Sequence, residues 1–124
     1  MDKNLEKNLE KNVKEDCIFC KIVKGELPST TVYEDDNVKV IENIKPVCST
    51  HLLVIPKVHT DNLMEYEGND LELGKVFNAA KKVADKLSLD SYRIVVNVGE
   101  DAGQSVMHTH VHILNDKSLK ENFI

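Results

Sequence analysis

The sequence predicts an α+β domain with an antiparallel sheet, and three observations support this fold class. One long amphipathic helix is indicated between about Asp70 and Leu87, where apolar residues recur at three- and four-residue steps. Short β-rich segments lie before and after this helix, without the regular strand-helix alternation of parallel sheets. The 124 residues, 41% hydrophobic and 30% charged, have the size and composition of one globular domain.

The first sixteen residues are predicted to form a flexible tail, and the folded domain is predicted to span residues 17–124. A four-residue phrase repeats from Lys3 to Val13 and places only three apolar side chains on one helical stripe. Because an isolated helix this short is marginal in water, a frayed helix or mobile tail is favoured over a partner-binding helix.

The domain is expected to begin with a short helical segment and to continue with strands. The segment from Cys17 to Lys24 is closed by Gly25 and followed by Pro28, which is typical of a helix end. Three strands are expected before the long helix and two after it, because β-branched segments alternate there with turn-forming residues. These strands are Thr31–Tyr33, Val38–Ile41, Leu52–Ile55, Tyr92–Val96 and Val106–Leu114.

Charge and hydropathy exclude several classes of function. The longest apolar run, Leu52 to Ile55, is far shorter than the roughly 20 residues that a membrane-spanning helix needs. The N-terminus lacks the apolar stretch of a secretory signal, so a cytoplasmic location is expected. A net charge of −5 without a basic stripe argues against a nucleic-acid partner, and any phosphate site must be local.

Three histidines that alternate with other residues are the strongest candidates for chemistry. In a strand, His108, His110 and His112 would share one face, spaced roughly 6.6–6.8 Å apart. Neutral imidazole is available at pH 7, so one of them can act as a nucleophile that forms a covalent intermediate. The alternatives are a surface strand lined with histidines and a single metal bound by all three.

The ordered motifs around these histidines resemble the histidine triad (HIT) family, in particular its Hint-like nucleotide-binding branch. The segment Val106–Leu114 follows the family signature of histidines alternating with hydrophobic residues, apart from Thr109. Segments upstream follow the same branch in the same order, namely Cys17–Ile22, Pro28, Tyr33–Asp36, Thr50–His59 and Arg93–Asn97. The resemblance covers about residues 16–114 and implies a HIT-like antiparallel sheet of about five strands with one long and one short helix.

The resemblance implies an enzyme that cleaves at the α-phosphate of purine nucleoside phosphoramidates or dinucleoside polyphosphates. His110 would be the nucleophile, and His112 would contact the α-phosphate. Ser105 would lie by the leaving group, and His51 would belong to a histidine network. The implied residues of the phosphate wall are Asn97, Gly103, Gln104 and Val106. Those implied at the base and ribose are Phe19, Ile22, Ile44 and Leu53. Core packing is the alternative for the last four. The alternative function is a nucleotide-sensing or scaffold protein with incidental activity.

Asn43 departs from the family pattern, in which an acidic residue accepts hydrogen bonds from both ribose hydroxyls. An asparagine offers one acceptor group and one donor group, so ribose binding is expected to differ. The segment from Asn115 to Ile124 also lacks the aromatic and proline-rich ending of the eukaryotic Hint proteins. Since that ending shapes leaving-group specificity, the resemblance does not imply a particular substrate.

A cysteine pair near the start of the domain indicates a metal site. Cys17 and Cys20 have a spacing at which two thiolates can bind one zinc ion, but they supply only half of a tetrahedral site. A redox dithiol and buried unliganded thiols are the alternatives, and Cys48 is expected to be a small packed residue. In similar HIT proteins two histidines complete a structural zinc site, and they correspond here to His59 and His108.

The resemblance also implies a homodimer formed through the long helix and the strand from Tyr92 to Val96. An exposed edge at Arg93 to Val96 would be prone to unwanted pairing unless something covers it. Two-fold dimers are also the commonest soluble oligomers. A monomer is the alternative, since the second face of the helix carries charged residues that can be solvated.

Overall fold

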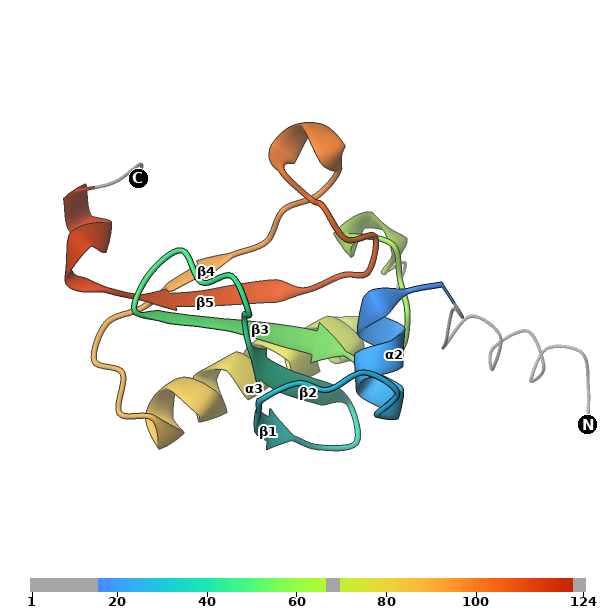
Figure 1. The fold of residues 1–124 in the computed structure, drawn as a ribbon, viewed down its shortest axis with the longest axis horizontal. Coiled ribbons are helices and arrows are strands. Elements are labelled where there is room, and N and C mark those ends of the chain that lie inside the picture. The colour runs from blue at the N-terminus through green and yellow to red at the C-terminus, as the bar shows by residue number, and fades with distance from the viewer. Residues whose placement is uncertain (1–15, 67–69, 122–124) are drawn as a thin grey trace, which may run out of the picture.

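The computed structural model describes residues 16–66 and 70–121, which form one antiparallel sheet with two α-helices (Figure 1). The α-helices and strands are α2 (Ile18–Lys24), β1 (Thr31–Glu34), β2 (Val38–Glu42), β3 (Thr50–Pro56), α3 (Asp70–Lys86), β4 (Arg93–Val95) and β5 (Val111–Asn115). Short 3-10 turns are η1 (Leu63–Glu65), η2 (Glu100–Ala102) and η3 (Lys117–Glu121). The strand order β1-β2-β3-β5-β4 confirms the predicted fold class. The predicted tail lies outside the described residues, apart from Asp16.

Alternation along the strands divides the apolar residues between two layers. On one face of the sheet, buried residues of β2, β3 and β5 pack against α3; this layer contains Val38, Val40, Leu52, Val54, Val111, Ile113, Val76, Ala79, Ala80 and Val83. On the opposite face, Leu53 and Ile55 pack with Phe19 and Ile22 of α2. Side chains two residues apart on a strand share a face, so His51 faces the α2 side. The site is therefore built on the face opposite α3.

Helix α2 begins and ends at signals that are present in the sequence. Cys17 is the N-cap, and its Sγ accepts a hydrogen bond from the N–H of Cys20 at 3.4 Å. Gly25 ends the helix with a φ of 82°, a left-handed conformation that favours glycine. The cap and the first turn of α2 thus place both cysteines at the same end of the helix.

Helix α3 packs through one side, as its amphipathic pattern predicts. Val76, Ala80 and Val83 are buried, whereas Phe77 remains 39% exposed. Figure 1 shows α3 running along one face of the sheet. Among the described helices, none has the length and apolar character required to cross a membrane.

Strand β5 is shorter than the predicted strand Val106–Leu114, because its pairing begins only at Val111. The partner strand β3 ends at Pro56, which has no N–H for a further ladder hydrogen bond. The N–H of Thr109 donates instead to the carbonyl oxygen of Thr60, at 2.8 Å. The prediction of a regular strand over the first two histidines of the triad was therefore wrong. They lie in a bend and an irregular segment that lead into β5.

Candidate active site and metal centre

His110 carries its proton on a defined nitrogen. Its Nδ1–H donates to the carbonyl oxygen of His108 at 2.7 Å, which leaves a lone pair on Nε2. The residue is 7% exposed, and its ring packs edge-on against Phe19 with ring centroids 5.0 Å apart. Burial lowers the pKa of His110 below its ordinary value. An unprotonated ring nitrogen is therefore available at neutral pH.

His51 and His112 form a hydrogen-bonded pair whose proton positions are set by the backbone. The N–H of Val47 donates to Nδ1 of His51 at 3.1 Å, so the proton of His51 is on Nε2. That Nε2–H donates to Nδ1 of His112 at 2.8 Å, which puts the proton of His112 on its own Nε2. This Nε2 is buried and has no hydrogen-bond partner among the described residues. Burial, then the neighbouring His110 and His51, lower the pKa of His112 to about 4.

The rings of His110 and His112 are adjacent, with centroids 5.0 Å apart. One ring has a lone pair on Nε2 and the other has an unused N–H on Nε2. A buried N–H without an acceptor costs about 1–3 kcal/mol, so this group favours an incoming oxygen, above all an anionic one. The pair can therefore attack an electrophilic centre and stabilise negative charge on a neighbouring oxygen.

The predicted phosphate-wall residues lie in and beside the turn at η2. Gly99 and Gly103 both have positive φ, at 91° and 94°, a conformation that favours glycine. A Cβ added at Gly103 would lie 3.9 Å from Nδ2 of Asn97, so these two predicted residues are neighbours. Ser105 is exposed. The turn therefore leaves Ser105 open to solvent.

The side-chain amide of Gln104 is fully used within the protein. Gln104 is 3% exposed, and its Oε1 accepts from the N–H of Gly99 at 2.8 Å. Its Nε2 donates to the carbonyl oxygens of Asp61 at 2.6 Å and Val106 at 3.1 Å. The amide thus holds the turn together, and a role at the phosphate wall stays a prediction.

Three of the four apolar residues predicted at the base and ribose are buried. Phe19, Ile22 and Leu53 are 6%, 8% and 5% exposed, and Val106 packs against the layer that contains them. Ile44, next to Asn43 in the chain, is 89% exposed. The three buried residues pack in this layer, and their contact with the base and ribose stays a prediction, while Ile44 offers apolar surface to solvent.

Asn43 joins the histidine network through an unfavourable contact. Its Nδ2 lies 3.2 Å from Nε2 of His51, and its Oδ1 accepts from the N–H of Lys45 at 2.9 Å. Because Nε2 of His51 carries a proton, two donors face each other there. A carboxylate at this position would accept from the N–H of Lys45 and would present no donor to His51. The amide at position 43 therefore bears on the histidine network as well as on any ribose contact.

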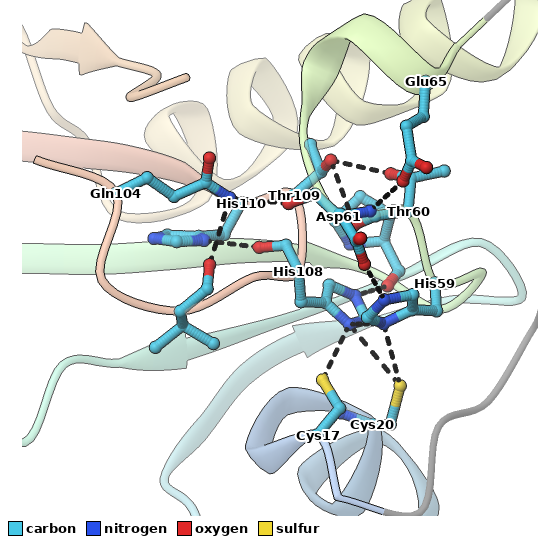
Figure 2. Close-up of polar contacts among 12 residues, drawn as sticks. Cys17, Cys20, His59, Thr60, Asp61, Glu65, Gln104, His108, Thr109 and His110 are labelled. Atoms are coloured by element: carbon cyan, nitrogen blue, oxygen red, sulfur yellow. Dashed lines mark hydrogen bonds and ion pairs between the residues drawn. The ribbon is translucent and has the colours of Figure 1, made fainter. Parts of the chain in front are cut away.

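Cys17, Cys20, His59 and His108 come together in one buried cluster, and Figure 2 shows both sulfur atoms pointing toward the two imidazoles. The four ligand atoms lie within 4.8 Å of one another. Three of the four sulfur-to-nitrogen distances are 3.3, 3.4 and 3.5 Å, and the two Nδ1 atoms are 3.0 Å apart. Ligands of a tetrahedral zinc ion lie roughly 3.3–3.8 Å apart, given the usual Zn–N and Zn–S lengths. The two thiols and two imidazoles are therefore the donor set of a zinc site, gathered at separations near those of a tetrahedral ion.

Both imidazoles of the cluster direct Nδ1 toward the cysteines because Nε2 is hydrogen bonded elsewhere. Nε2–H of His59 donates to the carboxylate of Asp61 at 2.7 Å, and Nε2–H of His108 donates to the carbonyl oxygen of Pro56 at 2.8 Å. Two Nδ1 lone pairs consequently face each other, which only a proton or a metal ion between them relieves. Burial lowers the pKa of His108 to about 4, which favours the neutral form that binds metals.

Sequence reasoning missed Asp61 and Val47, which fix proton positions in the two clusters. Asp61 lies two residues after a predicted metal ligand, and carboxylates are common partners of metal-binding imidazoles, so this spacing was a usable signal. Val47 acts through its backbone N–H, for which the side chain gives no signal. By contrast, the four residues of the buried Cys and His cluster were all named from the sequence and the resemblance, and the structure brings them together.

The fold and the alternating histidines together define a histidine triad protein. The model of the HIT domain matches residues 24–119, and the chain belongs to the HIT family. It is 44% identical over 106 residues to the 14 kDa zinc-binding protein of Zea mays, covering 82% of this chain and 83% of that protein.

Solved structures of similar proteins agree with this assignment. The HIT family hydrolase from Clostridium thermocellum matches with a TM-score of 0.84 and 42% identity, over 90% of this chain and 100% of that one. The histidine triad nucleotide-binding protein from Candida albicans matches with a TM-score of 0.73 and 35% identity, over 79% of this chain and 73% of that one.

Proposed function

We propose that the protein is a nucleotide hydrolase or transferase that cleaves at the α-phosphate of purine nucleoside phosphoramidates or dinucleoside polyphosphates. The observation that carries this proposal is the adjacent pair of histidines, one with a lone pair on Nε2 and the other with an unused buried N–H. The names of the Candida albicans and Clostridium thermocellum relatives, a nucleotide-binding protein and a hydrolase, support a nucleotide substrate and a hydrolytic reaction.

In the proposed mechanism, Nε2 of His110 attacks the α-phosphorus. An N–P bond forms while the bond from phosphorus to the leaving nitrogen or oxygen breaks, and the leaving group acquires a proton through the Ser105 hydroxyl. Nε2–H of His112 donates to a phosphoryl oxygen and stabilises the charge that develops there. Water then attacks phosphorus and the N–P bond breaks. The proton that the water loses restores the Ser105 hydroxyl, and a nucleoside monophosphate leaves neutral His110 behind.

The nucleotide is proposed to lie between two sets of side chains. The base and ribose would contact the segment that carries Asn43 and Ile44, with Phe19, Ile22 and Leu53 as the buried support. The phosphates would lie along Asn97, Gly103, Gln104 and Val106. Because Asn43 presents an amide where relatives have an acid, its contact with the ribose would use one acceptor in place of two.

A panel of substrates tests this function. Purified protein is incubated with fluorogenic adenosine and guanosine phosphoramidates and with dinucleoside polyphosphates, and release of the leaving group is followed. Turnover of at least one class, with a nucleoside monophosphate as product, is the expected result. Binding of nucleotides without turnover of any class would instead support a nucleotide-sensing protein.

We expect the acidic limb of the pH–rate profile to lie below pH 6.5, the ordinary pKa of histidine. Burial lowers the pKa values of His51 and His112, so their hydrogen-bonded pair remains neutral in mildly acidic solution. Protonation of Nδ1 in His112 would break that hydrogen bond, and kcat should fall as the pH falls through the lowered pKa. The measurement is kcat between pH 4.5 and 8.

Stability must be followed in the same samples, because the same pKa shifts act on folding. Between about pH 6.5 and 4 the unfolded chain binds protons that buried His112 does not, so the folded state loses stability as the pH falls. Rates are therefore compared only where the circular dichroism spectrum is native. A midpoint at or above pH 6.5 in folded protein would contradict the proposed neutral pair.

We propose that Cys17, Cys20, His59 and His108 hold a structural Zn²⁺ ion. The support is the fit of the buried cluster to a tetrahedral ion and the name of the Zea mays zinc-binding protein. With four protein ligands no coordination position is open, so bound zinc supplies folding energy and no reaction chemistry.

We also propose that the protein is a homodimer joined through α3 and β4. Among the described strands β4 pairs only with β5, and Ile94 and Phe77 are 36% and 39% exposed. Covering this edge would remove apolar surface and unpaired backbone groups from water. Light scattering at micromolar concentration should give about 28 kDa, twice the chain mass of 14.0 kDa. A mass near that of one chain would refute the dimer.

A further inference from the structure

The segment from Gly99 to Val106 includes the orange turn that projects from the body of the fold in Figure 1. It carries Gly103 and Ser105, and its two positive-φ glycines would have wide conformational freedom without fixed contacts. Catalytic groups act efficiently only when surrounding contacts hold them in place. We propose that Gln104 is a positioning residue that ties this turn to the metal-ligand segment 59–61, so that metal occupancy sets the order of the turn.

Gln104 closes the turn on itself. The N–H of Gly99 donates to Oε1 of Gln104 at 2.8 Å, and the backbone N–H of Gln104 donates to the carbonyl oxygen of Gly99 at 3.0 Å. Nε2 of the same side chain leaves the turn and reaches the carbonyl oxygen of Asp61 at 2.6 Å. Because Gln104 is 3% exposed, water competes little for these groups.

Asp61 receives hydrogen bonds from the turn and from the metal centre at once. Its carbonyl oxygen accepts from Gln104, while its carboxylate accepts from Nε2–H of His59 at 2.7 Å (Figure 2). Its own N–H donates to the carboxylate of Glu65. A metal ion that holds Nδ1 of His59 therefore also fixes Asp61, which gives Gln104 a stationary acceptor.

A second connection links the same two segments closer to His110. The N–H and Oγ1 of Thr109 lie 2.8 and 3.3 Å from the carbonyl oxygen of Thr60, and the two hydroxyls are 2.7 Å apart. Thr109 stands between His108, a metal-cluster residue, and His110, whose Nδ1–H is bonded to the carbonyl oxygen of His108. The segments that would hold the metal thus also orient His110, and Gln104 extends this support to the turn.

Methionine at position 104 would keep the length and burial of the side chain while removing both amide atoms. The N–H of Gly99 and the carbonyl oxygen of Asp61 would lose their partner in Gln104. Direct partners of metal ligands, such as Asp61 beside His59, alter metal affinity by roughly 10–100-fold. Since Gln104 holds that partner, the zinc dissociation constant should rise by roughly tenfold, the low end of this range. The kinetic expectation rests on the proposed function: kcat should fall by roughly tenfold or more with KM changed much less, because a loose turn weakens transition-state contacts.

The test compares Gln104→Met with Asn115→Leu in zinc-loaded protein. Asn115 is the control, because its side-chain amide also donates to a backbone carbonyl oxygen, that of Ser91. This contact lies at the C-terminal end of β5, away from the turn and the metal cluster. Zinc affinity is measured by competition with a chromophoric chelator, and amide hydrogen exchange is measured at Gly99 and Gln104. Gln104→Met should weaken zinc binding and speed exchange at both amides at least tenfold, whereas Asn115→Leu should stay within twofold of wild type.

Unchanged zinc affinity and unchanged exchange in folded Gln104→Met would overturn the coupling, whatever happens to turnover. If wild type turns over no nucleotide, the proposed function fails, but affinity and exchange still decide the coupling. Should the variant not fold, wild type is compared with and without zinc. If removal of zinc speeds amide exchange more at Gly99 and Gln104 than in β3, the proposal is supported. If removal of zinc speeds exchange equally at all these amides, the proposal is overturned.

Discussion

Replacing His110 with asparagine is expected to lower kcat by about 10,000-fold or more, because the side chain that forms the N–P bond is removed. The affinity for a nucleoside monophosphate should stay within a few fold of wild type. His110 is used in the reaction, whereas the packed residues around it, such as Phe19, remain in place. Turnover is measured with the best phosphoramidate of the panel, and binding by calorimetry.

His112→Asn is the matched comparison, since it also replaces an imidazole of the same strand-and-turn segment. It removes the donor at Nε2, a position that the shorter asparagine amide does not reach, but it leaves the nucleophile. A loss of about 100- to 1,000-fold is therefore expected, the usual effect of one oxyanion donor. A His110→Asn protein that keeps a rate close to wild type would rule out the proposed nucleophile. The proposed nucleophile would also be ruled out if both variants lost kcat equally and His110→Asn still formed a covalent intermediate.

Replacing Cys20 with serine should lower the free energy of unfolding by about 4 kcal/mol or more, the range in which loss of a metal site falls. Cys20 is 1% exposed and its Sγ lies 3.4 Å from Nδ1 of His59, so serine would leave the metal cluster incomplete. A fall in Tm of about 10 °C or more corresponds to this loss. The zinc content, measured by elemental analysis, should fall from about one ion per chain.

Cys48→Ser is the control for the cysteine substitution. Cys48 is half-buried, its Sγ donates to the carbonyl oxygen of Thr50 at 3.2 Å, and a serine hydroxyl can make the same bond. The change in stability should therefore stay within about 1 kcal/mol. Two results would contradict the structural zinc site. One is the absence of metal from wild-type protein purified without chelators. The other is a Tm of Cys20→Ser equal to that of Cys48→Ser.

The parts of the fold that follow local periodicity could be predicted from the sequence. The long helix, the β1–β2 hairpin and the Gly25 cap are each specified by residues close together in the chain. The start of β5 could not be predicted, because it depends on where β3 ends. Pro56 and the Thr60 carbonyl are distant in sequence from Thr109, yet together they turn its backbone away from the ladder.

The candidate site also has parts that the sequence could predict and parts that it could not. The spacing of Cys17 and Cys20 indicates a metal, but only the resemblance could add His59 and His108, since their approach depends on the tertiary fold. Hydrogen bonds to backbone groups set which ring nitrogen carries the proton in His51 and His110, and no side-chain pattern reports these bonds. The clash of two donors at Asn43 likewise emerges only once the proton of His51 is placed.

The most direct test of the proposed mechanism is to isolate the covalent intermediate. Wild-type protein is mixed with an adenosine phosphoramidate, and the reaction is quenched during turnover. Acid is avoided in the quench because it would hydrolyse an N–P bond. Peptides are then examined by mass spectrometry. The proposed mechanism predicts a nucleoside monophosphate on His110 that appears and decays with turnover. Active enzyme that never carries the group, or that carries it on another residue, would contradict it.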